Sequence, residues 1–207
     1  MKILNRDFFV RDTLTVSKEL LGKVLVHQTP EYAVAGRIVE TEAYLGPEDK
    51  AAHSYGGKIT PRTEIMYNQG GYSYIFAIYG MYHCFNIVTE KQGTPQATLI
   101  RALEPVTNME FMSEMRFNKA YTNLSSKQIR GLTNGPGKLC IAMGIGKEQN
   151  KIDMCERNGK DDIYVYDDGC KGYEIIASPR INIDYAEEYV QMPWRFTIKQ
   201  NMYVSRK

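Results

Sequence analysis

The sequence has few residues that could hold a metal ion or form disulfide bonds. Four cysteines and three histidines occur among its 207 residues, and no two cysteines have the C-x-x-C spacing. Structural zinc sites take four ligands from closely spaced cysteines and histidines. We therefore expect no metal site, and we expect no cofactor.

A long apolar run is also missing. The first ten residues include Lys2, Asn5, Arg6 and Asp7, whereas a signal peptide contains an apolar stretch of about 7–15 residues. No later segment reaches the length that spans a bilayer. These absences predict a cytoplasmic protein with reduced thiols and without a membrane partner.

The chain lacks a strong net charge, and it has no internal repeat, low-complexity tract or Pro/Gly/Ser-rich linker. Its 26 basic and 24 acidic residues leave a formal net charge of +2, which is small for a DNA-binding domain. Charge alone therefore does not indicate a nucleic-acid partner. A chain of this length can bury one sizeable core, so we expect a single domain over residues 1–207.

What is present is a mixture of helix and strand patterns without a regular βαβ rhythm. Helices are predicted at 11–22, with Asp12 or Thr13 as N-cap, at 104–117, and from about residue 136 onward. A capping box is predicted at Ser125 and Gln128. Strand patterns occupy 23–28, 33–44, a hairpin over 72–90, 96–103, 162–167, 174–178 and 194–198. This order predicts an α+β fold with mainly antiparallel strands.

The strand at 33–44 contains the unusual segment VETEAY. Side chains alternate along a strand, so Glu40, Glu42 and Tyr44 share one face, and the two glutamates are roughly 6.5–7 Å apart at Cα. Paired carboxylates suit a hydrolase in which one of them activates water. The alternative is a solvated face or ion pairs with Arg37 or Lys23. Tyr44 on that face, and Arg101 in another apolar strand, favour the first interpretation.

The hairpin has apolar residues at its tip. Gly80 and Met81 fit a two-residue type II′ turn, which places Tyr79, Met81 and Tyr82 at the tip. Proteins that open a duplex insert such side chains between base steps. Alternatively, Tyr79 and Tyr82 pack onto the polar, Gly- and Pro-rich segment 46–71, which we expect to be a long ordered loop or a set of short helical turns.

Further aromatic and polar residues are candidates for a ligand pocket. Tyr44 follows the glutamates, His53 lies in the long loop, Phe76 lies within the hairpin, and Asn86 interrupts the apolar run HCFNIV. Aromatic faces stack on flat ligands, while an amide or imidazole can read their polar edges. In isolation, however, Phe76 fits a core position and His53 fits a loop histidine with satisfied hydrogen bonds.

Four motifs, in order, resemble the alkyladenine (3-methylpurine) DNA glycosylase family: RIVETEAYLGPEDKAAHSYGGKITPRTEIMY, IYGMYHCFNIV, LIRALEP and GPGKLCIAMGI. The resemblance implies a curved antiparallel sheet with a hairpin that protrudes into the DNA minor groove. It also implies a monomeric base-excision-repair enzyme that acts on double-stranded DNA containing damaged purines, in the cytoplasm or, in a bacterium, at the nucleoid.

The resemblance also implies a role for each site residue. Glu42 matches the general base that activates water, and Arg101 matches an arginine that positions this water near the target phosphate. Tyr44, His53 and Phe76 match residues that stack on the flipped base, although some members have Tyr at the Phe76 position. Asn86 matches the residue that disfavours normal guanine. Tyr79 matches the intercalating tyrosine at the hairpin tip, and Met81 and Tyr82 lie beside it.

None of the pocket residues that these motifs supply is a lysine, so a Schiff-base lyase step is not expected. Hypoxanthine, etheno-adenine, 3-methyladenine and 7-methylguanine are the lesions that the resemblance suggests. Two other interpretations stay open. One is a noncatalytic nucleic-acid-binding module, and the other is a hydrolase of small nucleosides or sugars that uses both Glu40 and Glu42.

Overall fold

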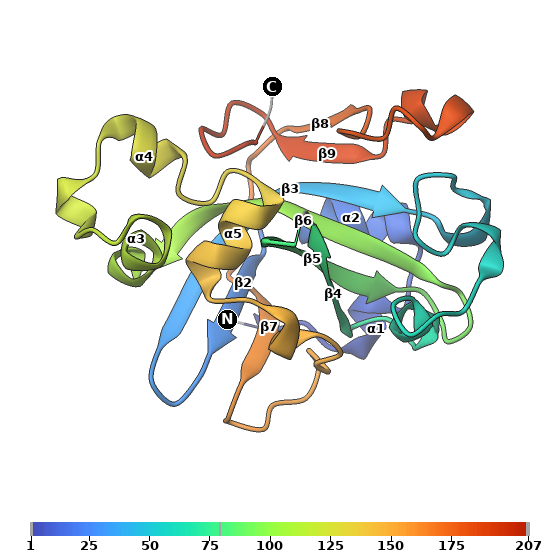
Figure 1. Ribbon diagram of the computed structural model, residues 1–207, viewed down its shortest axis with the longest axis horizontal. Coiled ribbons are helices and arrows are strands. Elements are labelled where there is room, and N and C mark those ends of the chain that lie inside the picture. The colour runs from blue at the N-terminus through green and yellow to red at the C-terminus, as the bar shows by residue number, and fades with distance from the viewer. Residues whose placement is uncertain (1, 79, 206–207) are drawn as a thin grey trace.

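An antiparallel sheet forms the centre of the computed structural model, which describes residues 2–78 and 80–205 (Figure 1). Every strand pairing that involves the named strands is antiparallel, and the sheet does not close into a barrel. In sheet order, the main path runs through β1 (Lys2–Ile3), β7 (Asp162–Asp167), β2 (Val24–Gln28), β3 (Ala33–Tyr44), β6 (Gln96–Thr107), β5 (Tyr82–Thr89) and β4 (Ser73–Ile78).

The sheet branches at β3. One edge of β3 pairs with β6, while the other edge pairs first with β2 and then, over residues 40–42, with β9 (Arg195–Ile198). β8 (Ile175–Ser178) pairs with β9 and ends this branch. The two glutamates therefore lie on the part of β3 that has strands on both sides. The expected mixture of helices with a large antiparallel sheet is confirmed.

Short helices surround the sheet. The α-helices are α1 (Arg6–Phe9), α2 (Thr13–Leu20), α3 (Met109–Phe117), α4 (Ser126–Arg130) and α5 (Pro136–Met143), and the 3-10 helices are η1 (Gly46–Glu48), η2 (Tyr55–Gly57), η3 (Glu64–Tyr67), η4 (Tyr121–Asn123), η5 (Lys147–Gln149) and η6 (Glu187–Gln191). In Figure 1, α3 and α4 lie at the left end, and the 46–71 segment lies at the right. Within the described part of the chain, no helix is long and apolar enough to cross a bilayer.

Several helices begin at the capping residues that the sequence predicts. Asp12 is the N-cap of α2, and its carboxylate accepts a 2.8 Å hydrogen bond from Thr15 N. Ser125 and Gln128 form the predicted capping box at α4. Segment 46–71 contains three short 3-10 helices, which confirms the expectation of helical turns in this loop.

The helix predicted at 104–117 is shorter in the structure, where it begins at Met109. β6 continues to Thr107, since Glu104 still pairs with Arg37 on β3, and α3 starts only after Asn108. Pro105 is tolerated in this strand because β5 pairs with β6 only over residues 96–99, so the missing N–H of the proline is not needed there.

The hairpin turn also differs from the prediction. Ile78 pairs with Tyr82, which leaves three residues between the strands, so the predicted two-residue type II′ turn is wrong. Gly80 has φ of 68°, a conformation that glycine adopts without steric cost. A three-residue connection with a glycine in the left-handed region is the next common solution for a hairpin.

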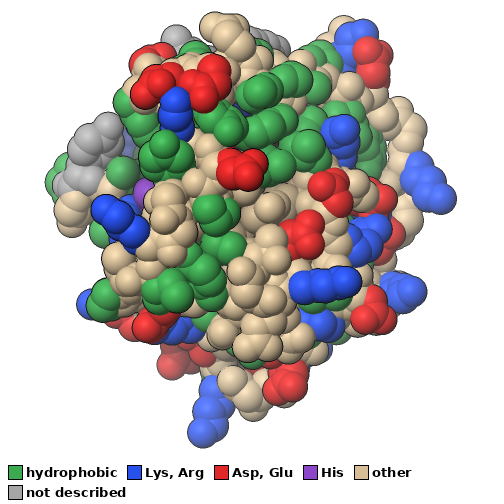
Figure 2. Space-filling view, turned by 90° about the vertical axis from the view of Figure 1, so that its right-hand side faces the viewer, with side chains coloured by type: hydrophobic (Ala, Val, Ile, Leu, Met, Phe, Trp, Pro, Cys, Tyr) green, Lys and Arg blue, Asp and Glu red, His purple; other side chains and the backbone are tan. Residues whose placement is uncertain are grey.

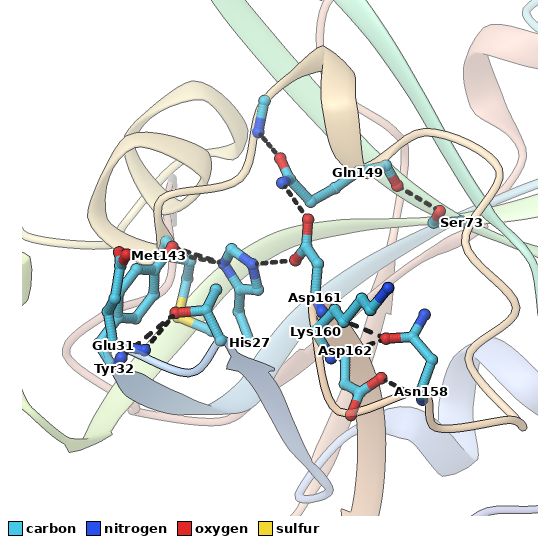
Figure 3. Close-up of polar contacts among 12 residues, drawn as sticks. His27, Glu31, Tyr32, Ser73, Met143, Gln149, Asn158, Lys160, Asp161 and Asp162 are labelled. Carbon is cyan, nitrogen blue, oxygen red and sulfur yellow. Dashed lines mark hydrogen bonds and ion pairs between the residues drawn. The ribbon is translucent and has the colours of Figure 1, made fainter.

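A polar network around the buried ring of His27 connects the segment between α5 and β7 to the sheet (Figure 3). The ring of His27 on β2 is 2.7 Å from the carbonyl oxygen of Met143 and 2.8 Å from a carboxylate oxygen of Asp161. Gln149 donates to the other oxygen of Asp161 at 2.8 Å, and Ser73 Oγ donates to the Gln149 carbonyl at 2.6 Å. The C-terminal end of α5 is thus tied to both β2 and β4.

Candidate active site

Glu40 and Glu42 are fully buried and share one arginine. Arg101 on β6 donates from Nε to Glu40 Oε1 at 3.1 Å and from NH1 to Glu42 Oε2 at 3.3 Å. Burial by itself lowers the pKa of Arg101, but the Glu42 and Glu40 carboxylates raise it above its ordinary value. The alternating pattern of β3 therefore does place both carboxylates on one face, as the sequence predicts, but this face points into the protein.

The pairing of these glutamates with Lys23 or Arg37 is excluded. Lys23 donates to Asp167 at 2.8 Å, and Arg37 forms a bidentate pair with Asp168 at 3.1 and 2.9 Å. The solvated alternative is also wrong, because neither glutamate side chain is exposed.

The Glu40 carboxylate accepts hydrogen bonds from the C-terminal part of the chain. Its Oε1 accepts hydrogen bonds from Arg195 Nε at 2.7 Å and Ser205 Oγ at 2.9 Å, in addition to Arg101, and its Oε2 accepts from Ser205 N at 2.7 Å. These contacts hold β9 and the segment before residue 206 against β3. The contacts of Glu40 therefore indicate a structural role.

Glu42 has a different set of donors. Its Oε2 accepts from the Tyr44 hydroxyl at 2.9 Å and from Arg101, whereas its Oε1 accepts from the backbone N–H of Ile181 at 2.8 Å. Each carboxylate oxygen has two lone pairs. Among the described residues, Oε1 takes a single hydrogen bond, so one of its lone pairs has no protein donor there.

A cavity of about 320 Å³ is lined by the three residues that bind this carboxylate, Tyr44, Arg101 and Ile181, whereas Glu42 itself is not among the lining residues. The structure brings Tyr44, His53, Phe76, Asn86 and Arg101 together in its lining, from β3, the long loop, β4, β5 and β6. Other lining side chains come from β4, β5, the start of α5 and segment 181–185, and they include Tyr74, Ile78, Cys84, Pro136, Ile181 and Tyr185. Glu42 lies behind Tyr44 and Arg101. This volume is of the size that holds a small flat ligand.

An aromatic cluster forms one wall of the cavity. The rings of His53 and Phe76 meet edge to face at 4.5 Å, and the Tyr74 and Phe76 rings are 5.5 Å apart. The Tyr74 hydroxyl is 2.8 Å from His53 Nδ1. Desolvation of the imidazole, together with the nearby Arg62 cation, lowers the pKa of His53 to about 4. The ring is therefore neutral at neutral pH.

Arg62 decides which tautomer of His53 is present. Its NH2 group is 3.1 Å from His53 Nε2, and its guanidinium lies 4.9 Å over the ring of Phe76. A guanidinium can only donate, so Nε2 is the acceptor and the proton of the neutral imidazole is on Nδ1, where it faces Tyr74. Tyr74 and Arg62 thus fix the orientation and the tautomer of His53.

Asn86 is held by the backbone of its own hairpin. The side-chain Nδ2 donates to the carbonyl oxygen of Tyr74 at 2.9 Å, and the residue is only 3% exposed. The neighbouring Cys84 is inert, because burial raises the pKa of its thiol to about 12. The amide therefore presents a fixed polar group in an otherwise largely apolar part of the lining.

The hairpin tip is exposed. Met81 is 70% exposed and Tyr82 is 39% exposed. Tyr82 lies against α5, since a Cβ added at Gly137 would be 3.0 Å from the Cβ of Tyr82. The expected packing of Tyr82 onto the 46–71 loop is therefore not what anchors it. Tyr79, the third predicted tip residue, lies outside the described residues.

Sequence reasoning missed two residues that shape the site. Tyr74 reads as an ordinary strand tyrosine, and the N–H of Ile181 comes from a segment 139 residues away from Glu42 in the chain. A local sequence pattern cannot predict that a backbone N–H will donate to a distant side chain, as that of Ile181 does. For Tyr74, the alternation of β4 offers a weak signal, because Tyr74 and Phe76 share a strand face.

Comparisons with known proteins identify the family of the chain. The profile of the family described as Methylpurine-DNA glycosylase (MPG) matches residues 7–202. A candidate 3-methyladenine DNA glycosylase of Desulfitobacterium hafniense (strain Y51) is 53% identical over 207 residues, which is all of both chains. One of Alkaliphilus oremlandii (strain OhILAs) is 53% identical over 204 residues, 99% of each chain. The resemblance drawn from the motifs is confirmed: the chain belongs to the methylpurine-DNA glycosylase family and is a DNA-repair hydrolase of N-glycosyl bonds.

Proposed function

We propose that this enzyme is a monofunctional glycosylase that flips damaged purines out of double-stranded DNA and hydrolyses the N-glycosidic bond with a water activated by Glu42. The observation that carries the proposal is the buried Glu42 carboxylate, which is bound by three residues of the cavity lining, Tyr44, Arg101 and Ile181, and whose Oε1 takes a single hydrogen bond among the described residues. A damaged base in the cavity would bring its anomeric carbon toward this carboxylate.

The chemical step needs a water, a base and stabilisation of positive charge. The water attacks C1′ of the deoxyribose, the bond from C1′ to the base nitrogen breaks, and Glu42 accepts the proton of the water. The transition state resembles an oxocarbenium ion. The negative charge of Glu42 stabilises it electrostatically. Arg101 and Tyr44 hold the carboxylate by Oε2, which leaves Oε1 to orient the water.

Selection of the base begins with stacking. A flipped purine between Tyr44 on one side and His53 with Phe76 on the other gains stacking energy, and a cationic alkylated purine gains about 1 kcal/mol more from cation–π attraction. Neutral His53 adds no repulsive charge to that base. Phe76 supplies the same flat surface as the tyrosine of other members, without a phenolic hydrogen bond.

Rejection of normal guanine falls to Asn86. Its amide is fixed by the carbonyl of Tyr74, so it cannot turn to accommodate the exocyclic amine of guanine. A fixed polar group that clashes with an abundant competitor, or leaves it unpaired, provides specificity. Damaged bases also pair and stack less well, which lowers the cost of flipping them.

The exposed hairpin serves to open the duplex. Met81 and Tyr82 are on its described part, and Tyr79 completes the tip as the residue that fills the gap left by the base. Lys58 in the long loop and the start of α5 at residues 135–138 are the candidates for contact with backbone phosphates, and Lys138 also donates to Asn134 Oδ1 at 2.8 Å. Arg62 lies in the same loop as Lys58, but its guanidinium donates to His53 Nε2. The protein acts as a monomer in this proposal.

The test is base release from a set of duplexes. Each duplex carries one 3-methyladenine, 7-methylguanine, hypoxanthine or etheno-adenine, and hot alkali after incubation reveals abasic sites as strand breaks. We expect breaks with at least one of these lesions and none with undamaged DNA. Without alkali, the strand stays intact, and borohydride traps no covalent adduct. Strand cleavage without alkali, or a trapped adduct, would contradict the monofunctional mechanism.

A further inference from the structure

Arg180 has the most completely enclosed guanidinium near the active site. Its side chain and that of Asp49 are both fully buried, and they form a bidentate ion pair with distances of 2.6 and 2.8 Å. The guanidinium also donates to the carbonyl oxygen of Ala43 at 2.9 Å. It lies 4.7 Å over the ring of Tyr44 and 5.0 Å over that of Trp194.

These contacts connect three parts of the site. Ala43 and Tyr44 belong to the end of β3, next to Glu42. Asp49 also accepts from the backbone N–H groups of Leu45 and Ala51, so it organises the loop that leads to His53. On the other side, Arg180 is followed directly by Ile181, whose N–H donates to Glu42 Oε1.

The segment after Arg180 is part of the cavity. Ile183 and Ala186 pack against Ala51 and Tyr44 in a small apolar cluster, and segment 181–185 contributes to the cavity lining. A displacement of Arg180 would therefore move the donor to Glu42 and the wall opposite His53 together.

Stability alone is a poor explanation for this ion pair. Burying two charges is costly, and apolar residues of similar volume often replace such a pair without loss of stability. In addition, Arg180 Nε is buried without a hydrogen-bond partner among the described residues, which costs further free energy. Such an arrangement is expected where geometry matters more than stability.

We propose that Arg180 and Asp49 are a positioning pair that sets the Ile181 N–H against Glu42 and the Tyr44 ring against the cavity. This inference rests on the proposed role of Glu42 as the base. Arg180 does not touch the reacting atoms. It acts through Ile181 and Tyr44.

The test compares Arg180→Lys with a matched control. Lysine keeps the charge but cannot span both oxygens of Asp49 and the Ala43 carbonyl at once. Arg37→Lys is the control, because Arg37 also pairs with a carboxylate in bidentate fashion and donates to a backbone carbonyl, that of Gly22, at the far end of β3. Single-turnover base release gives a maximal rate and a half-saturating enzyme concentration, and thermal unfolding gives a midpoint.

We expect Arg180→Lys to lower the maximal rate by about 10- to 100-fold, because small displacements of catalytic groups have effects of this size. The half-saturating concentration should change much less than the rate. Arg37→Lys should keep the wild-type rate even if its midpoint falls. Should Arg180→Lys fail to fold, Asp49→Asn, which is isosteric and keeps one acceptor oxygen, is measured in the same way.

The measurements can refute the positioning pair and the proposed function separately. If Arg180→Lys, or Asp49→Asn in its place, releases base as fast as Arg37→Lys while Glu42→Gln is inactive, the positioning pair is refuted and the proposed function stands. If Glu42→Gln itself keeps the wild-type rate, the proposed function is refuted. A variant that loses affinity for lesion DNA but keeps its maximal rate also refutes the positioning role.

Discussion

Two glutamates on one strand have different surroundings, from which we propose that they have separate functions. Arg101, Arg195 and Ser205 direct four hydrogen bonds to Glu40, whereas Glu42 faces Tyr44, Arg101 and one backbone N–H next to a cavity. Glu40 Oε2, like Glu42 Oε1, takes a single hydrogen bond among the described residues, but Arg195 and Ser205, which bind Glu40, do not line the cavity, whereas all three residues that bind Glu42 do. This difference argues against a hydrolase that uses both carboxylates.

The pH dependence of stability follows from His53. Its pKa is lowered from 6.5 to about 4 in the folded protein, so between these values the unfolded chain binds a proton that the folded chain does not. The free energy of unfolding therefore falls as the pH drops through this window. We expect the urea midpoint of the wild type to fall more between about pH 7 and about pH 5 than that of His53→Gln.

Urea unfolding at both pH values, followed by tryptophan fluorescence of the single Trp194, provides the measurement. Equal decreases in the two proteins would show that His53 is not held neutral by its neighbours. Base release should show no step between pH 6 and 8 from this residue, since His53 stays neutral over that range.

At the level of single residues, the sequence could indicate the site only in part. Tyr44, His53, Phe76, Asn86 and Arg101 were chosen from motifs, and the structure brings them to one cavity. Their roles in catalysis and base selection remain predictions. Their partners could not be found from local patterns, because Arg180 and Asp49 are 131 residues apart. Such a pair is defined only when two distant segments pack.

Among the larger elements, the hairpin depends on α5. Because Gly137 lies so close to Tyr82, we expect Gly137→Ala to push the hairpin away from α5 and to weaken binding of lesion-containing duplex several-fold. Pro136 and Ile78 line the cavity near this contact, but most of the lining lies farther from it, so the base-release rate at saturation should change less than the affinity. The binding constant and the single-turnover rate are the two measurements.

Gly135→Ala is the matched control for this prediction. An added Cβ at Gly135 would meet only the flexible Lys138 side chain at 3.7 Å, and this substitution lies on the same turn, two residues earlier. Equal effects of Gly135→Ala and Gly137→Ala would indicate a general disturbance of the helix start rather than contact with the hairpin.

Most of the elements could be predicted, and the errors have physical causes. The strands at 24–28, 33–44 and 162–167 follow alternation or apolar runs, and α2 follows its N-cap. The extension of β6 through Pro105 could not be predicted, because it depends on β3 as a distant partner. The length of the hairpin turn depends likewise on the register of β4 and β5.

For the molecule as a whole, charge is distributed without a dominant sign. Figure 2 shows acidic and basic side chains scattered among hydrophobic and uncharged ones on the face that carries the long loop, in agreement with the net charge of +2. We therefore propose that recognition of DNA depends on the hairpin, the cavity and a few local cations rather than on a broad basic surface.

At the branch point of β3, the last strand of the chain, β9, pairs with the central sheet. β9 and Ser205 reach Glu40 from one side, and β6 supplies Arg101 from the other. The C-terminal segment therefore supports the wall behind the active site, and the glutamate that holds it is two residues from the proposed base.

The most direct test of this account measures single-turnover base release by Glu42→Gln and Glu40→Gln on a duplex with one damaged purine. We predict that Glu42→Gln still binds the lesion but loses at least about 100-fold in rate, the usual contribution of a general base. Glu40→Gln should lose about 3 kcal/mol of stability, as expected when a buried ion pair is broken, and yet keep most of its rate. A Glu42→Gln protein as fast as the wild type would contradict the central claim.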